Sequence, residues 1–483
     1  MQVNRMSKRC ITTRRGFLRA CGLTLASLAV GGAARVEGRD RRPNIVYIMT
    51  DQQFAGAMSC TGNLHLHTPA LDRLAALGVR FDKAYCSFPL CVPSRTAMFS
   101  SRMPHEAGVY VNCSVSQGMF PFMTLGRAVA NAGYDCHYIG KWHLTIPTSR
   151  REVHGFSEVV LGGGHGHDAE RAERAVQFLR DSHDKPFFLV VSLLNPHDCC
   201  QLARGEDLTR FEGGIGPTPT EAELPPLPDN FEIPAGEPDQ LRAWQKENSA
   251  RVYRSHFWDE KQFREYLWGY YRLVEKVDAE IGKVLTALRE SGQEENTVVI
   301  FASDHGDGHS RHRWNQKWSL YDESARVPFI VAWKGRTLAG RVDHHLVSSG
   351  LDLLPTICDY AGARVPDGCL GRSVRRLAEG RVQATWRQYL VSETSFGNWA
   401  KVGEAGFAKA RMVRTNRYKY IAYDQGQRRE QLIDMEADPG EMENLVDRPE
   451  LAEVVQQHRD YLAQWGRRTQ DDFDLPGDKK ARS

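Results

Sequence analysis

The sequence lacks both a long apolar run and a strong net charge. No segment approaches the roughly 20 consecutive apolar residues that a membrane-spanning helix needs. Its 483 residues include 63 Lys and Arg against 60 Asp and Glu, a formal net charge of +3. Such a near balance argues against a strongly basic nucleic-acid binder. We therefore expect no stable membrane span and no nucleic-acid partner.

Cysteine pairs of the C-x-x-C type are missing too, although the chain has 11 cysteines. Without such pairs, a zinc ribbon or a dithiol redox motif is not expected. Cys10 and Cys21 lie in a basic N-terminal segment, so nine of the 11 cysteines remain beyond it. An odd number leaves at least one cysteine unpaired, and the sequence does not determine any pairing.

The N-terminal segment has a basic region followed by a short apolar run. The residues TRRGFLR (13–19) precede the apolar residues 21–32, and Ala33 or Ala34 fits a small-residue cleavage site. This order resembles a twin-arginine export signal over residues 1–34, the alternative being a disordered basic tail. We expect a bacterial protein that uses the twin-arginine export machinery and is periplasmic or secreted.

Beyond the N-terminal segment, apolar runs alternate with helical patterns. The runs are short and continuous, as in the buried strands of a parallel sheet, at residues 44–50, 135–139, 186–194 and 297–303. Amphipathic helical patterns cover residues 68–78, 125–132, 171–182 and 263–291. The alternation predicts an α/β fold in which a large, mostly parallel sheet is sandwiched by helices.

Two regions depart from this alternation. Residues 201–255 are rich in proline and acidic residues, which predicts a surface insertion that could line or cover a cleft. After about residue 385 the pattern changes to short strands and hairpins, at residues 389–393, 410–415, 418–423 and 430–434. We therefore predict a catalytic domain over residues 42–380 and a smaller C-terminal subdomain with an antiparallel sheet over residues 381–483.

Polar residues follow the predicted strands at the end where open α/β sheets bind ligands. They are Asp51-Gln52, Lys141 with His143, His197, and Asp304-His305. Taken singly, each has a structural alternative: a helix cap, a solvated loop or a turn. Taken together, the oxygen-rich side chains indicate a hard divalent cation, and the basic ones indicate an anionic substrate held against it.

A further candidate is the segment CVPSR at residues 91–95, where a helix is predicted to begin. Cys91 there could be a thiol nucleophile with a lowered pKa, a disulfide partner or a metal ligand. Arg95 lies four residues later, so on a helix both side chains share a face. A helix N-terminus and an arginine both favour negative charge at residue 91.

The segment CVPSR also matches the C-x-P-S-R signature of type I, formylglycine-dependent sulfatases in the alkaline-phosphatase-like superfamily. Other segments resemble that family in the same order: residues 43–52, GKWHL at 140–144, SDHGD at 303–307 with His312, Lys317 and Tyr321, RVP at 326–328, and residues 414–445. The resemblance spans about residues 42–450, most of the chain beyond the export signal.

This resemblance implies that a formylglycine-generating enzyme converts Cys91 to Cα-formylglycine, whose hydrate is the nucleophile. It implies metal ligation by Asp51, Gln52, the modified Cys91, Asp304 and His305. It implies catalytic roles for Cys91, Arg95, Lys141, His143, His197 and Lys317, and sulfate binding by Lys141, His143, His197, His312 and Lys317. In these roles, Arg95 steadies the hydrate, His197 or Lys317 protonates the leaving oxygen, and His143 assists sulfate release.

The chain departs from the family at two metal positions. Many members have a second carboxylate where this chain has Gln52, and an asparagine where it has His305. Both changes lower the negative charge at the metal, so the ion is an open question: Ca²⁺ is favoured by the resemblance, with Mg²⁺ and Mn²⁺ as alternatives. His309 could face the substrate or could be an ordinary loop histidine.

The function expected from these observations is an exported sulfatase that hydrolyses sulfate esters of a small molecule or a sulfated carbohydrate. A sugar substrate rests on the predicted export and on residues near the presumed cleft, such as Arg311, Arg313, Trp314 and Trp399. One alternative is a phosphodiesterase or phosphonate monoester hydrolase of the same superfamily. Another is a non-catalytic glycan-binding relative in which Cys91 is unmodified.

Overall fold

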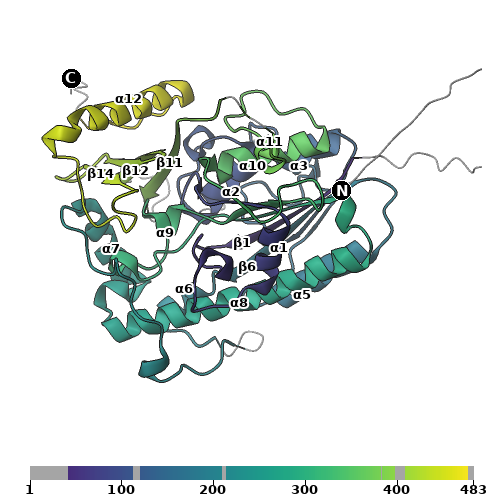
Figure 1. Ribbon diagram of the computed structural model, residues 1–483, viewed down its shortest axis with the longest axis horizontal. Coiled ribbons are helices and arrows are strands. Elements are labelled where there is room, and N and C mark those ends of the chain that lie inside the picture. The colour runs from purple at the N-terminus through teal and green to yellow at the C-terminus, as the bar shows by residue number, and fades with distance from the viewer. Residues whose placement is uncertain are drawn as a thin grey trace, which may run out of the picture. The chain divides into compact units, whose positions relative to one another are not determined.

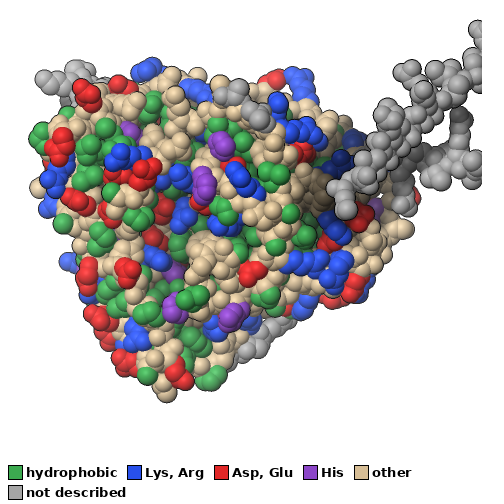
Figure 2. Space-filling model, viewed as in Figure 1, with side chains coloured by type: hydrophobic (Ala, Val, Ile, Leu, Met, Phe, Trp, Pro, Cys, Tyr) green, Lys and Arg blue, Asp and Glu red, His purple; other side chains and the backbone are tan. Residues whose placement is uncertain are grey.

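A computed structural model describes residues 42–112, 120–208, 214–381, 383, 385–397 and 408–476 of the chain. The predicted export signal over residues 1–34 lies outside these residues, as do Cys113 and Trp399. Among the described helices, none is both long and apolar enough to cross a bilayer. On the face drawn in Figure 2, side chains of both charge signs are interspersed, in keeping with the near balance of charge.

An eight-stranded sheet forms the centre of the larger part, in the order β5-β4-β6-β1-β7-β8-β2-β9. Figure 1 labels two of its strands, β1 and β6. Its strands are β1 (Asn44–Asp51), β2 (Val79–Phe81), β4 (Asp135–Gly140), β5 (Glu158–Val160), β6 (Phe187–Pro196), β7 (Thr297–Ser303), β8 (Phe329–Ala332) and β9 (Arg341–Asp343). Strand β8 is antiparallel to both neighbours, and every other pair is parallel. The predicted large, mostly parallel sheet is confirmed.

Helices cover both faces of this sheet, because alternate residues of its buried strands point to opposite sides. Ile45, Tyr47 and Met49 of β1 pack into one core, and Val46 and Ile48 pack into the other. The first core is closed by α2 (Cys91–Ser100), α3 (Leu125–Asn131) and α10 (Ser349–Ala361). The second is closed by α1 (Pro69–Leu77), α5 (Asp168–Arg180) and α8 (Glu260–Glu290).

The smaller sheet is antiparallel, as predicted, with the order β11-β12-β13-β14. Its strands are β11 (Tyr389–Phe396), β12 (Ala408–Thr415), β13 (Tyr418–Tyr423) and β14 (Glu430–Asp434). The C-terminal helix α12 (Ala452–Thr469), which the sequence reading did not include, packs Val455, Leu462 and Trp465 onto one face of this sheet. The other face contributes Met412 and Ile421 to a cluster shared with the loops of the larger part.

The predicted insertion over residues 201–255 is partly buried. It contains α7 (Asp239–Arg251), whose Leu241 and Trp244 join the cluster that also holds Tyr321 and Ile421. The segment therefore packs between the strand-end loops and the antiparallel sheet in addition to lying at the surface. The remaining elements are short: α4 (Arg151–His154), α6 (Cys199–Ala203), α9 (Asp322–Ala325), α11 (Arg375–Ala378), and the two-stranded sheet of β3 (Ala84–Tyr85) and β10 (Val347–Ser348).

All eight described cysteines are free thiols, so no disulfide links the described parts of the chain. They are Cys60, Cys86, Cys91, Cys136, Cys199, Cys200, Cys358 and Cys369.

Candidate active site

The site begins with two neighbouring strands that end at the same edge of the sheet. Strands β1 and β7 are paired in register up to Thr50 and Ser303, so the residues that follow, Asp51 and Asp304, lie side by side. The N-terminus of α2 brings Cys91 to the same place, with its Sγ 3.7 Å from Oδ1 of Asp51. The register of the strands and the start of one helix thus assemble side chains that are far apart in the sequence.

Asp51, Cys91, Asp304 and His305 form a compact donor set, called here the catalytic cluster. All four are fully buried, and one ligand atom from each lies within 4.8 Å of the others. Sγ of Cys91 is 3.2 Å from Nε2 of His305, whose Nδ1 lies 2.8 Å from the carbonyl of Gly306. Two carboxylates and an imidazole that converge in this way suit a divalent cation. The four residues of the catalytic cluster are four of the five predicted metal ligands.

Arg95 ties the two carboxylates together. Its guanidinium donates to Oδ2 of Asp51 and to Oδ2 of Asp304, both at 2.9 Å, and the side chain is fully buried. Its remaining nitrogen donates to the carbonyl of Lys141 at 2.8 Å and to Oγ of Ser192 at 3.0 Å. Arg95 shares a helix face with Cys91 as predicted, but its hydrogen bonds hold the carboxylates in place and none goes to Sγ of Cys91.

Two lysines line the cluster. Nζ of Lys141 is 2.7 Å from Oδ2 of Asp51, and its side chain keeps 13% of its surface exposed. Nζ of Lys317 lies 3.2 Å from Sγ of Cys91 and 2.9 Å from Oε1 of Gln52. The structure therefore places both predicted lysines within reach of a group attached at Cys91.

Gln52 is held by several hydrogen bonds of its own. Its backbone N–H donates to Oδ1 of Asp304 at 3.1 Å, and its Nε2 donates to Oδ2 of Asp307 at 2.8 Å. Its Oε1 accepts from Lys317, so a metal at this site would have to share that oxygen with the ammonium group. The structure places Gln52 beside the cluster and gives its amide oxygen another partner.

The charges in the site perturb one another's pKa values. Burial alone would raise the pKa of Asp51, but Lys141, His197 and Arg95 outweigh it and hold the pKa well below its usual range. Burial, together with the charge of Asp51, raises the pKa of Asp304 to about 6. At Cys91, burial and the charge of Asp51 raise the pKa of the thiol. The charges of Lys317, Lys141 and His305 lower it by more, so the pKa falls well below its usual value.

His143 and His197 each have a buried ring nitrogen, Nδ1, with no hydrogen-bond partner among the described residues. Burial lowers the pKa of His143. Burial would also lower the pKa of His197, but the Cys200 thiolate beside it outweighs that effect, and the pKa rises to about 9. Buried polar atoms without partners are rare in folded proteins, so they mark a place that an additional polar group can occupy.

The structure does not bring His312 to this cluster. Its ring stacks on Tyr321 with centroids 3.9 Å apart, and its Nε2 bonds the carbonyl of Gly440 at 2.9 Å. His309, whose role was left open, is buried against the rings of Phe54 and Tyr270. Among the described residues, neither histidine has a hydrogen bond to the catalytic cluster, and both belong to the packing around it.

Two residues that the sequence reading missed also lie in the site. Sγ of Cys200 is 3.5 Å from Oε1 of Gln52 and 3.0 Å from Oε1 of Gln316. His165, from a glycine-rich loop, stacks on His197 with ring centroids 5.7 Å apart and an interplanar angle of 29°. His165 follows no predicted strand, and Cys200 lies three residues beyond His197, so no signal in one sequence marked them.

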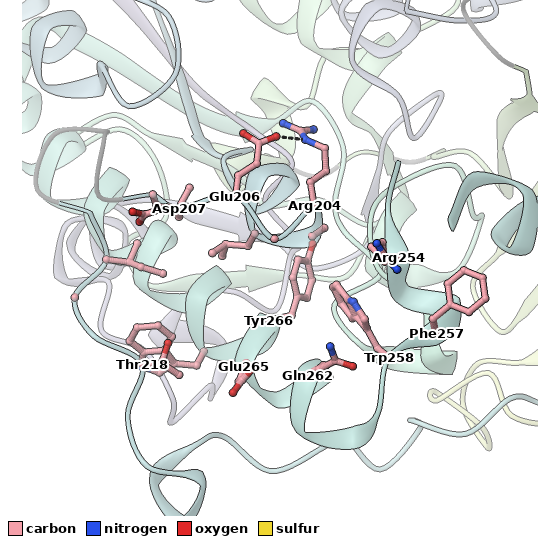
Figure 3. A pocket seen from close by; sticks show the side chains of 17 residues that line it. Arg204, Glu206, Asp207, Thr218, Arg254, Phe257, Trp258, Gln262, Glu265 and Tyr266 are labelled. Carbon is pink, nitrogen blue, oxygen red and sulfur yellow. Dashed lines mark hydrogen bonds and ion pairs between the residues drawn. The ribbon is translucent and has the colours of Figure 1, made fainter. Parts of the chain in front are cut away.

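A separate cavity of about 580 Å³ lies beside α6 and the start of α8 (Figure 3). Arg254, Trp258, Gln262 and Tyr266 are among the residues that line it, and none of the predicted site residues does. Tyr266 connects this cavity to the site, because its hydroxyl donates to Oδ2 of Asp307 at 2.8 Å, the carboxylate that also holds Gln52.

Comparisons with known proteins agree with this geometry. The sulfatase family model matches residues 43–363, and a model of the C-terminal part of N-sulphoglucosamine sulphohydrolase matches residues 310–468. The chain is 32% identical over 462 residues to a Δ4,5-hexuronate-2-O-sulfatase of Bacteroides thetaiotaomicron, covering 92% of each protein. It is 27% identical over 505 residues to an N-acetylglucosamine-6-O-sulfatase of the same organism, covering 89% of this chain and 87% of the relative.

Among solved structures, one described as a 2-O GAG sulfatase superposes with a TM-score of 0.78 at 31% sequence identity. The match covers 90% of this chain and 95% of that one.

Proposed function

The chain belongs to the sulfatase family of the alkaline-phosphatase-like superfamily, and from this premise we propose that it hydrolyses sulfate esters of sulfated carbohydrates with a nucleophile made from Cys91. The observation that supports the proposal most directly is the position of Cys91. Its Sγ lies at the first turn of α2, 3.2 Å from both His305 Nε2 and Lys317 Nζ, in a fully buried cluster. A group at this position is surrounded by cations and metal-type donors, as sulfuryl transfer requires.

A thiol alone does not suit this chemistry, because a sulfated sulfur or serine oxygen has no internal route to release sulfate. Conversion of Cys91 to formylglycine would supply a hydrated aldehyde, with one hydroxyl to attack sulfur and a second to expel sulfate. Ser94 and Arg95, the other polar residues of the signature, are both buried in the finished structure. The conversion therefore fits an enzyme that acts on the chain before it folds, which we propose as a formylglycine-generating enzyme.

The donor set also fits one divalent cation. Asp51, Asp304 and His305 would hold it together with the modified residue 91, and the bound ion would supply positive charge against the sulfate oxygens. Carboxylate oxygens favour Ca²⁺ or Mg²⁺, and the imidazole of His305 leaves Mn²⁺ as an alternative. We keep Ca²⁺ as the first ion to test.

The surrounding side chains bind the sulfate and move the proton. Lys141 and Lys317 hold sulfate oxygens in this proposal, and the support is that each has its Nζ within about 3 Å of an atom of the catalytic cluster. His197, whose pKa of about 9 keeps it protonated at neutral pH, donates a proton to the leaving oxygen as the S–O bond breaks. His143, with its lowered pKa, is neutral and can accept the proton that must leave before sulfate is released.

For the substrate we propose a sulfated sugar of the glycosaminoglycan type, with a 2-O-sulfated unsaturated hexuronate as the first compound to test. The support is a relative of that activity that aligns along 92% of its own length and of this chain. The test is to compare turnover of the 2-O-sulfated unsaturated disaccharide, glucosamine 6-O-sulfate and an aryl phosphodiester. A clear preference for the phosphodiester would contradict the proposal and indicate a phosphonate or phosphodiester hydrolase instead.

The nucleophile and the metal have tests of their own. Intact-mass analysis of the peptide that contains residue 91 should show a loss of about 18 Da, from exchange of the thiol for an aldehyde. An alkylatable, unshifted Cys91 in protein from its native host would instead favour a non-catalytic glycan-binding protein. Removing the metal with a chelator should abolish turnover, and Ca²⁺, Mg²⁺ and Mn²⁺ added back singly identify the ion.

We also propose that residues 1–34 direct export through the twin-arginine pathway and that the mature protein is periplasmic or secreted. The pattern TRRGFLR followed by an apolar run supports this assignment. Replacing Arg14 and Arg15 with lysines should keep the unprocessed protein in the cytoplasm of the native host. We retain the predicted division into residues 42–380 and 381–483, which limited proteolysis of the mature chain can test.

A further inference from the structure

The histidine proposed as the proton donor lacks the hydrogen bond that usually orients such a ring. Catalytic histidines are commonly fixed by a carboxylate or a carbonyl on the second ring nitrogen. Here Nδ1 of His197 is buried without any hydrogen-bond partner among the described residues. Its Nε2 lies 3.9 Å from Sγ of Cys200, a long contact that fixes a ring only weakly.

What His197 does have is a second imidazole stacked on it. The ring of His165 lies nearly parallel to it, with centroids 5.7 Å apart and an angle of 29° between the planes. Such offset stacking is an ordinary attractive geometry for aromatic rings. Packing against His165, with only the long contact to Cys200 beside it, therefore defines the plane in which His197 presents its nitrogens.

His165 is itself held firmly by the residue next to His197. Its Nδ1 is 2.7 Å from Oδ1 of Asp198, whose carboxylate is nearly fully buried. The other carboxylate oxygen, Oδ2, accepts the backbone N–H of Gly166 at 3.1 Å. One carboxylate thus fixes both the stacked ring and the backbone of the loop that carries it.

The loop is also tied to strand β6, which ends directly before His197. Arg171 donates to the carbonyls of Gly163 and Gly164 and, at 2.7 Å, to Oδ1 of Asp168. Asp168 in turn accepts the backbone N–H groups of Leu194 and Asn195 at the end of β6, at 2.7 and 2.8 Å. Gly162 and Gly166 adopt φ of +65° and +76°, which lets the loop fold back over the strand end.

We propose that His165 is a positioning residue, which orients the proton-donating ring of His197 by stacking on it. The inference rests on the proposed function, because it assigns a partner to the proton donor of that reaction. Its consequence depends on the leaving group. A sugar hydroxyl leaves poorly and needs the proton, whereas 4-nitrophenolate leaves well without one.

The test compares full-length wild type with His165→Ala and His165→Phe on two sulfate esters. The substrates are 4-nitrophenyl sulfate and the 2-O-sulfated unsaturated hexuronate disaccharide. We expect His165→Ala to lower kcat on the disaccharide by about 10²-fold, the lower end of what general acid catalysis contributes, and to change kcat on the aryl sulfate by less than about 3-fold. His165→Phe, which keeps a ring to stack, should recover most of the loss.

A matched control is His65→Ala, because His65 is an exposed histidine that also stacks on an aromatic ring, that of Tyr271, outside the site. It should leave both rates unchanged. A crystal structure of His165→Ala supplies a readout independent of activity, and the ring of His197 should occupy more than one orientation.

Equal losses of kcat on both esters, no loss on either, or an unmoved His197 ring would overturn the inference while leaving the proposed function in place. Failure of His165→Phe to recover activity would also overturn it, since the stack would then not be what matters. A fully modified, metal-loaded wild type that hydrolyses neither ester would overturn the proposed function itself, and the inference with it.

Discussion

Two of the buried groups of charged residues in the described part of the chain differ in how completely they are paired. In the first, the catalytic cluster, the neighbouring histidines His143 and His197 keep ring nitrogens without partners, and Lys141 stays partly exposed. In the second, called here the Lys419 cluster, Nζ of Lys419 contacts Asp322 at 2.5 Å, Glu441 at 2.6 Å and the carbonyl of Leu320 at 3.3 Å.

This difference in pairing separates buried charges that can bind a ligand from buried charges that stabilise the fold. An ammonium group has three N–H donors, and Lys419 has three acceptors for them, so nothing is left to bind anything else. Lys419 belongs to β13 of the antiparallel sheet and Asp322 to α9 of the larger part, so this pairing fastens the sheet to the strand-end loops. Beside the catalytic cluster, the rings of His143 and His197 keep polar atoms without partners among the described residues, which is what a substrate needs.

The largest effect is expected on turnover, from a substitution in the catalytic cluster. Cys91→Ser should reduce steady-state turnover of sulfate esters by at least about 10⁴-fold, because a serine cannot become an aldehyde hydrate and would stay sulfated. The melting temperature should stay close to that of the wild type, since the two side chains are nearly the same size. Multiple turnovers by this variant, measured against enzyme concentration, would refute the proposed chemistry.

The next largest effect is expected on stability, from a substitution in the Lys419 cluster. Lys419→Met leaves Asp322 and Glu441 buried without their cation, and we expect it to cost about 3–5 kcal/mol of unfolding free energy in urea denaturation. The matched variant is Lys317→Met, which removes a buried lysine that lines the catalytic cluster. It should cost about 1 kcal/mol or less in stability while abolishing turnover. If both lysines lowered stability alike, the contrast between the clusters would fail.

A smaller effect concerns pH. Burial and the charge of Asp322 raise the pKa of Glu441 and the charge of Lys419 lowers it, which together bring the pKa to about 8. A carboxyl whose pKa is higher in the folded state stabilises the fold below the ordinary pKa near 4.5, and that stability is lost as pH rises from about 4.5 to 8. Glu441→Gln should therefore flatten the dependence of unfolding free energy on pH across this window. An unchanged slope would show that Glu441 does not titrate there.

The smallest effect is a control for both clusters. Arg364 and Asp367 form an ion pair at 2.9 Å whose side chains are 82% and 88% exposed. Solvent screens such a pair, so Arg364→Ala should change the unfolding free energy by no more than about 0.5 kcal/mol and leave turnover unchanged. A larger change would mean that burial is not what separates the Lys419 cluster from a surface pair.

Much of the fold was predictable because it depends on local periodicity. The strand from Asn44 was recognisable from its continuous apolar run, and the helix that ends at Glu290 from the spacing of its apolar residues. The antiparallel β8 was not, because a four-residue apolar strand carries no direction. Helix α12 was missed although its apolar residues have helical spacing, and it is needed to cover one face of the small sheet.

The sequence by itself determined which chemical groups the site can use. Asp51, Asp304 and His197 follow apolar strands, and Cys91 begins a helix, so local pattern made them candidates, and the order of the family motifs gave them roles. Only the tertiary structure decided how these groups are paired: that Arg95 holds the carboxylates, that His312 stacks on Tyr321 away from the cluster, and that His165 lies on His197. The physical reason is that pairing depends on distances between segments brought together by sheet order and loop geometry, which have no counterpart in the local sequence.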